Sequence, residues 1–158
     1  MPDGARRWAP IAEPGSMASP TVPRRWSTEL DGIRWLPRMI DKARMSHRGE
    51  LGNYLLGHSP VDRALLTRIG LTTEQFSEIV RQSPDDAAVL EAIRAHWDEA
   101  RVRRWSARFT STYRTYIVLW DIDEGYVRPN GLQALGIALF KPLEGAAMSA
   151  FRRIRRAP

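Results

Sequence analysis

Three charged residues, Arg38, Asp41 and Lys42, stand close together in a segment whose other residues follow a helical pattern. An arginine and a lysine one helical turn apart can hold a phosphate or a carboxylate, because both donate charge-assisted hydrogen bonds to anionic oxygens. A carboxylate beside them can orient the guanidinium group. The spacing therefore suggests a binding site for a small anionic ligand on this helix.

A purely structural interpretation of the same residues stays open. Arg38 and Asp41 are three positions apart, so they could form a surface ion pair worth only a few tenths of a kcal/mol, with Lys42 in solvent. Two features favour the ligand. The charges crowd onto a helix that also carries an apolar stripe, and a glycine-rich loop follows whose backbone N–H groups could approach an anion.

Tyr54 and Asp62 flank this loop, residues 49–59, and could complete such a site. The Tyr54 hydroxyl could donate to a ligand oxygen, and Asp62 could act as a base or a hydrogen-bond acceptor. Alternatively, Tyr54 is a half-buried aromatic anchor, and Asp62 belongs to a helix cap that begins at Ser59. The candidate ligand-binding residues are Arg38, Asp41, Lys42, Tyr54 and Asp62, and no catalytic role is assigned to any residue.

The helix that carries the three charged residues should begin near Pro37, because a proline suits the first helical turn. Its apolar residues recur at i, i+3, i+4 and i+7, which predicts a buried stripe; they are Leu36, Met39, Ile40 and Ala43. The charged residues and Met45 then fall mostly on the flank. Gly49 and Gly52 should end the helix and form the loop.

Further helix starts are predicted at Ser59, Thr72 and Ser83, each followed by apolar residues at helical spacing. The last of these patterns continues from Val89 to Phe109. Residues 112–120 contain strand-forming side chains, but their apolar residues also follow helical spacing, so a helix is predicted there. The predicted fold class is all-α, a small single domain of about five to seven helices.

The two ends differ from the middle of the chain. Residues 1–23 contain five prolines and no sustained period, which predicts a disordered leader in which Met17 is an alternative start. Residues 24–128 should form the helical domain. Residues 129–158 predict an apolar and basic extension of two short helices broken at Pro142.

The net charge of +6 is unevenly distributed along the chain: +2 over residues 1–28, −1 over 29–125 and +5 over 126–158. A protein that binds phosphates should carry its positive charge on the folded face, so only the ends are expected to do so here. The alternative function is a non-enzymatic interaction module. It would use the helical face and the arginine-rich tail, residues 143–156, to bind a protein, a membrane surface or a nucleic acid weakly.

Several classes of function are excluded or disfavoured. The chain has no cysteine, which rules out disulfides and thiolate chemistry, and its three histidines are scattered, so no metal site is expected. No nucleophile-elbow or phosphate-binding glycine motif is present, and no cofactor is expected. The sequence contains neither a secretory signal nor an apolar stretch of about 20 residues, which fits a cytoplasmic protein.

Six segments carry a resemblance to a known family; they are residues 35–44, 49–54, 60–62, 71–76, 104–109 and 121–126. Together they resemble the bacterial domain-of-unknown-function family 5069, over about two-thirds of the chain. The resemblance implies a small helical intracellular domain and no assigned activity. The chain departs from the family pattern at Ser59, where many members carry a cysteine, so a function of that thiol would not transfer.

Overall fold

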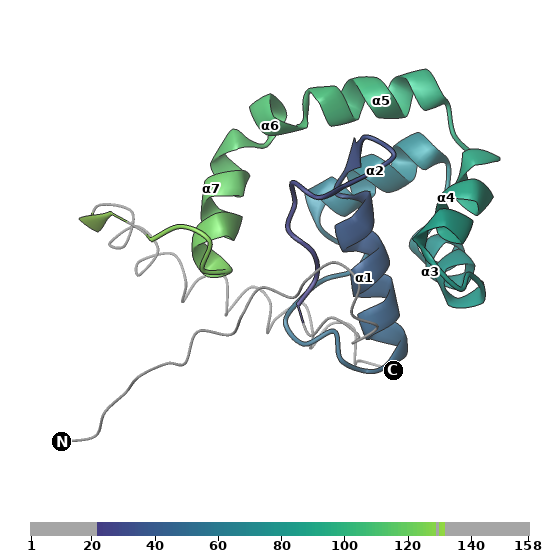
Figure 1. Cartoon of the computed structure of the whole chain (residues 1–158), viewed down its shortest axis with the longest axis horizontal. Helices are drawn as coiled ribbons and strands as arrows, with labels where there is room; N and C mark the ends of the chain where they lie inside the picture. The colour runs from purple at the N-terminus through teal and green to yellow at the C-terminus, as the bar shows by residue number, and fades with distance from the viewer. Residues whose placement is uncertain (1–21, 129, 132–158) are drawn as a thin grey trace, which may run out of the picture. The chain divides into compact units, whose positions relative to one another are not determined.

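The computed structural model describes residues 22–128, 130 and 131, which belong to two units divided between Ala107 and Arg108. The described part of the first unit contains a short hairpin and five helices, and that of the second contains two helices (Figure 1). The prediction of a small, mostly helical fold is confirmed. The alternative start, most of the predicted leader and the basic residues 143–156 lie outside the described residues.

The elements of the first unit are β1 (Glu29–Leu30), β2 (Ile33–Arg34), α1 (Leu36–His47), α2 (Pro60–Ile69), α3 (Thr73–Gln82), α4 (Asp86–Arg94) and α5 (Glu99–Ala107). Those of the second are α6 (Phe109–Thr112) and α7 (Arg114–Asp123). Within the second unit, α6 packs against the start of α7, where the Phe109 and Tyr113 rings lie 4.8 Å apart.

The hairpin was not predicted from the sequence. It pairs Leu30 with Ile33 across a two-residue turn, Asp31 and Gly32, whose φ angles are 51° and 73°. Such turns need positive φ at both central positions, and an Asp-Gly pair is a common solution. With only two residues in each strand, the alternating pattern was too short to identify. Ser106 of α5 anchors the hairpin, because its Oγ accepts from the Arg34 N–H and donates to the Gly32 carbonyl, both at 2.9 Å.

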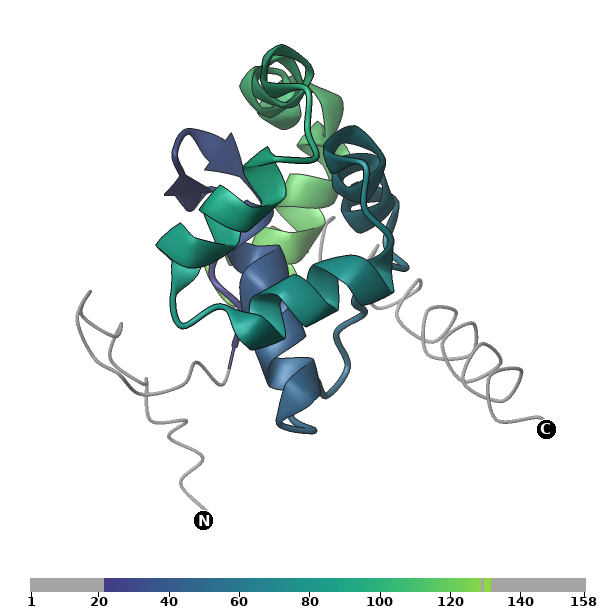
Figure 2. The ribbon, with the colours of Figure 1, turned by 90° about the vertical axis from the view of Figure 1, so that its right-hand side faces the viewer.

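Helix α1 lies at the centre of the first unit and packs against β1 and α3. All four residues of its predicted apolar stripe are fully buried, which confirms the stripe. In Figures 1 and 2, α3 and α4 lie side by side, and α5 runs along α2. The other apolar side chains of this unit with no exposed surface come from β2 and from α2 to α5; they are Ile33, Leu65, Ile69, Phe76, Val89, Ile93 and Val102.

Two of the three predicted helix starts are capped as expected. Ser59 Oγ accepts from the N–H of Asp62, and the Thr72 and Gln75 side chains form a reciprocal capping box. The start predicted at Ser83 is wrong, because Ser83 is the C-cap of α3 and the Asp85 side chain caps α4 by accepting from the Ala88 N–H. The continuous pattern from Val89 to Phe109 is divided in two, because α4 ends at Arg94 and α5 starts at Glu99. The helix predicted over residues 112–120 is confirmed as α7.

Gly57 offers a test of how tightly the loop before α2 is packed. Its φ is +75°, and a Cβ built there would lie 2.0 Å from Thr73 Oγ1, whereas a Cβ at Gly49 (φ +71°) meets nothing within 4 Å. Left-handed backbone costs any other residue about 1–2 kcal/mol. We expect Gly49→Ala to lower the free energy of unfolding by this backbone cost alone. Gly57→Ala should lower it by a further 1–3 kcal/mol or so, because the added Cβ overpacks the contact with Thr73. Urea denaturation measures both, and equal losses would contradict this packing.

Candidate functional site

Helix α1 begins at a strained residue, Trp35. Its φ is 69°, a left-handed conformation that costs a residue with a side chain about 1–2 kcal/mol. The indole ring is 3% exposed, and its Nε1–H donates to Asp62 Oδ1 at 2.7 Å. Both cations of the following turns lie over this ring, since Arg38 Cζ and Lys42 Nζ are each 5.3 Å from its centroid. Trp35 therefore connects three of the predicted site residues.

Lys42 and Asp62 form a buried ion pair. Their side chains are 4% and 0% exposed, and Lys42 Nζ lies 2.6 Å from both carboxylate oxygens. Lys42 also donates to the Leu55 carbonyl at 2.9 Å, so its three N–H donors have three acceptors. Asp62 accepts in addition from the Gly57 N–H at 2.9 Å. This pair corrects one structural alternative, because Lys42 is not in solvent. Asp62 does belong to the Ser59 cap through its backbone N–H, while its carboxylate faces Lys42, Trp35 and Gly57.

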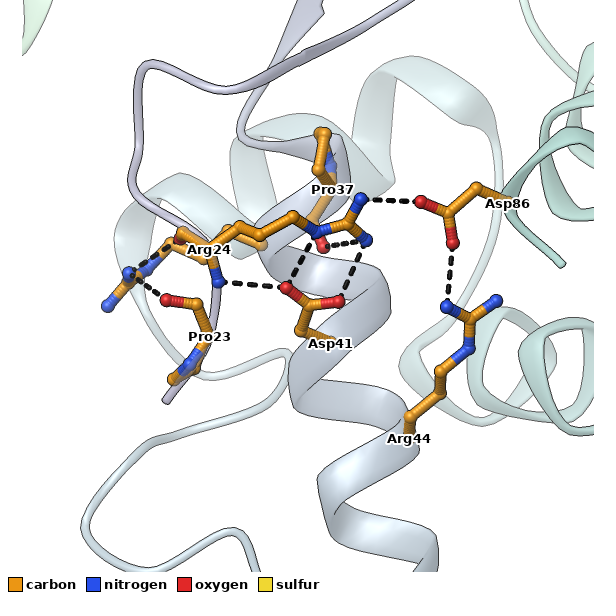
Figure 3. Close-up of polar contacts among 7 residues, drawn as sticks. Pro23, Arg24, Pro37, Asp41, Arg44 and Asp86 are labelled. Atoms are coloured by element: carbon orange, nitrogen blue, oxygen red, sulfur yellow. Dashed lines mark hydrogen bonds and ion pairs between the residues drawn. The ribbon is translucent and has the colours of Figure 1, made fainter. Parts of the chain in front are cut away.

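Asp41 faces away from Arg38 and binds Arg24, which precedes the hairpin. Arg24 Nε and Nη2 donate to the two carboxylate oxygens at 2.8 Å each, and the Arg24 backbone N–H adds a third bond at 2.8 Å (Figure 3). The Asp41 side chain is 3% exposed. The expected pair of Arg38 and Asp41, three positions apart, is thus replaced by a pair that spans 17 positions.

Arg24 also reaches α4, where Asp86 joins it to a second arginine. Asp86 Oδ2 accepts from Arg24 Nη1 at 2.6 Å, and Oδ1 accepts from Arg44 Nη1 at 2.7 Å (Figure 3). Burial by itself raises the pKa of Asp86, but hydrogen bonds and attraction from the two arginines lower that pKa below its usual value. Burial likewise lowers the pKa of Arg24, and its two carboxylate partners raise that pKa overall. Both groups therefore stay ionised at neutral pH.

Arg38 is buried against aromatic rings and the N-terminal segment. The residue is 4% exposed, and its Cζ lies 5.4 Å from the ring centroid of Tyr54 as well as close to Trp35. Its Nη1 donates to the backbone carbonyl of Arg24 at 2.9 Å and to that of Pro23 at 3.4 Å. The contacts of Arg38 thus include two aromatic faces and two backbone carbonyls.

We call this set of seven side chains the ionic cluster; they are Arg24, Arg38, Asp41, Lys42, Arg44, Asp62 and Asp86. Four of the five predicted site residues meet around Trp35, either directly or through one partner. Asp41 is also in the cluster but belongs to its Arg24 side. Arg24 and Asp86 were not predicted as site residues from the sequence. No local pattern could have paired them, because they lie 62 positions apart.

The fold and the cluster together define a small, mostly helical domain built around buried ion pairs. The chain belongs to the family described as Domain of unknown function (DUF5069), whose model matches residues 20–125. This confirms the resemblance found in the sequence. No curated protein matches the chain.

Two findings on the described residues bear on other classes of site. In that part of the chain, no group of three or more His, Asp or Glu residues is arranged to hold a metal ion. None of the helices there has the length and hydropathy needed to cross a membrane.

The buried pair of Lys42 and Asp62 predicts a large loss of stability when one partner is removed. Lys42→Met should cost about 3–5 kcal/mol of unfolding free energy, because it leaves a buried carboxylate without its counter-charge. The double variant, Lys42→Met with Asp62→Asn, should lose less unfolding free energy than the two single variants lose in sum. The difference, which is the coupling energy of the pair, should be roughly 1–3 kcal/mol. Chemical denaturation of the natural chain, the two single variants and the double variant measures this double-mutant cycle.

The matched control is the exposed ion pair of Glu78 and Arg81, whose side chains are 48% and 58% exposed. Arg81→Met should change the free energy of unfolding by less than about 1 kcal/mol. A cost for Lys42→Met no larger than that of the control would show that the buried pair is not a structural requirement.

Proposed function

We propose that the domain binds a small oxyanion, a carboxylate or a phosphate, at Arg38 beside the loop of residues 49–59. The observation that carries the proposal is the setting of the Arg38 guanidinium, which is buried, lies over two aromatic rings and donates to backbone carbonyls. A carboxylate or phosphate can accept two parallel hydrogen bonds from a guanidinium and also attracts it as an opposite charge, whereas a backbone carbonyl carries no net charge. An anion that replaces the carbonyls at Nη1 therefore gains energy.

The charge of the ionic cluster supports an anionic rather than a neutral ligand. Its four cations and three carboxylates leave one positive charge in excess. Lys42 is matched by Asp62, and Arg24 and Arg44 are matched by Asp41 and Asp86. An excess of positive charge within the cluster attracts an anion rather than a neutral ligand.

The other candidate residues take indirect roles in this proposal. Lys42 adds positive potential at the same indole ring but keeps its three hydrogen bonds. Tyr54 is close enough to Arg38 for its hydroxyl to donate to a bound anion. Asp41 and Asp62 position the site, the first by holding the Arg24 segment and the second by holding Lys42 and Trp35.

Replacement of the Arg38 charge tests the proposal. In the full chain, acetate and inorganic phosphate should raise the melting temperature and shift the indole N–H resonance of Trp35, assigned by comparison with Trp35→Phe. Arg38→Gln, which keeps a donor for the carbonyls, should weaken this response by roughly tenfold or more, which corresponds to 1.4 kcal/mol. Arg81→Gln, an exposed control, should respond as the natural chain does.

Two results would contradict anion binding at Arg38. The first is the absence of any saturable response of the natural chain to either anion. The second is an equal affinity in Arg38→Gln while circular dichroism shows that the variant is folded. A preference for acetate over phosphate, or the reverse, identifies the class of oxyanion.

We propose as the second candidate an interaction module that uses an apolar helical face and the arginine-rich residues 143–156. It is favoured by apolar side chains exposed on α7 and on the turn after it, with 51% of Tyr116, 47% of Leu119 and 49% of Tyr126 accessible to solvent. Exposed apolar side chains that form a continuous patch are characteristic of contact surfaces.

Truncation of the full chain after Pro129 tests this second candidate. Binding to vesicles that contain phosphatidylserine should weaken steeply with added salt and should be lost on truncation, because basic side chains next to apolar ones bind anionic surfaces. Vesicle co-sedimentation measures the binding. Undiminished binding by the truncated chain would contradict a role of the tail.

A further inference from the structure

Arginines without an internal partner gather on two helices that pack together, α2 and α5. Among the described residues of the first unit, Arg63, Arg101 and Arg104 are exposed, and their side chains make no hydrogen bond or ion pair. Other exposed arginines of this unit are neutralised; Arg94 and Arg103, for example, share Asp31 at 2.7 and 2.8 Å. The exposed arginines without an internal partner in this part of the chain therefore all lie on α2 and α5.

A fourth arginine lies where α2 meets α5. The Arg68 guanidinium is 5.6 Å from the ring centroid of Trp105, and its Nη1 donates to the Ala64 carbonyl at 2.6 Å. Arg101 and Arg104 are three positions apart on α5, a spacing at which helical side chains are neighbours. We call these four residues, Arg63, Arg68, Arg101 and Arg104, the basic face.

The carboxylates of the same two helices do not cancel this charge. Asp62 is buried on Lys42, and Glu99 binds Arg103 at 2.7 Å. Asp98, at the start of α5, caps the helix by accepting from the Arg101 backbone N–H at 3.1 Å. Of the three carboxylates, Asp98 is thus the one that is not paired with a cation among the described residues.

We propose that the basic face binds the phosphate backbone of a nucleic acid. Guanidinium groups match phosphate oxygens in geometry and charge, and backbone binding depends on such contacts alone. The exposed large apolar side chains of the described residues lie outside α2 and α5, and Trp105 is 7% exposed. A membrane needs apolar groups to insert, and a protein interface usually has an exposed aromatic or aliphatic anchor. The composition of the face therefore favours a polyanion held by charge.

Two matched triple variants of the full chain test the basic face. One carries Arg63→Gln, Arg101→Gln and Arg104→Gln, and the other carries Arg152→Gln, Arg153→Gln and Arg155→Gln in the tail. Both lose three charges, so any effect of net charge alone is the same. The probes are a fluorescein-labelled mixed-sequence DNA duplex and a single-stranded RNA, measured by fluorescence anisotropy over a range of salt concentrations.

The basic-face variant should bind at least roughly tenfold more weakly, and its slope of log K against log salt should fall by about 3, one for each lost phosphate contact. The tail variant should keep most of the affinity and most of the salt dependence of the natural chain. Melting temperatures should stay close to that of the natural chain, because the three side chains have no internal partners. Equal binding by the basic-face variant, a loss confined to the tail variant, or no binding by the natural chain would each overturn the proposal.

Discussion

Two buried carboxylates, Asp41 and Asp62, impose the condition on which the rest of the structure depends. An unpaired carboxylate inside a protein costs several kcal/mol, so each needs a cation close by. Lys42 comes from the same helix as Asp41 but binds Asp62 of α2, while Asp41 takes Arg24 from the segment before the hairpin. These pairs connect α1 to α2 and to the N-terminal segment. Through Asp86 they also reach α4.

Helix α1 is consequently buried on an apolar side and on a charged side. The apolar stripe supplies non-directional burial, which tolerates more than one arrangement of the neighbouring helices. The charged flank is directional, because hydrogen bonds such as those from Arg24 to both oxygens of Asp41 require particular distances and angles. We infer that the charged flank selects which segments meet on α1, and that the stripe supplies most of the stabilisation.

The functional proposals follow from where charge remains after this internal pairing. Inside the ionic cluster, four cations and three carboxylates leave one positive charge in excess. On the surface of the same unit the excess is on the basic face. The sum of charges over residues 29–125, which is −1, conceals both, because it gives equal weight to exposed side chains and to carboxylates buried against cations. The expectation that only the chain ends could bind phosphates rests on that sum.

The sequence by itself determined the helices, since apolar spacing, caps and glycines act over a few residues: the buried stripe of α1, the Ser59 cap and the helical state of residues 114–123 could all be predicted. It also grouped Arg38, Asp41, Lys42, Tyr54 and Asp62, of which all but Asp41 meet around Trp35. Only the tertiary structure decided that Arg24 binds Asp41 and Asp86. Those partners lie 17 and 62 positions away, and the energy of an ion pair depends on distance in space and on burial, neither of which is written in local spacing.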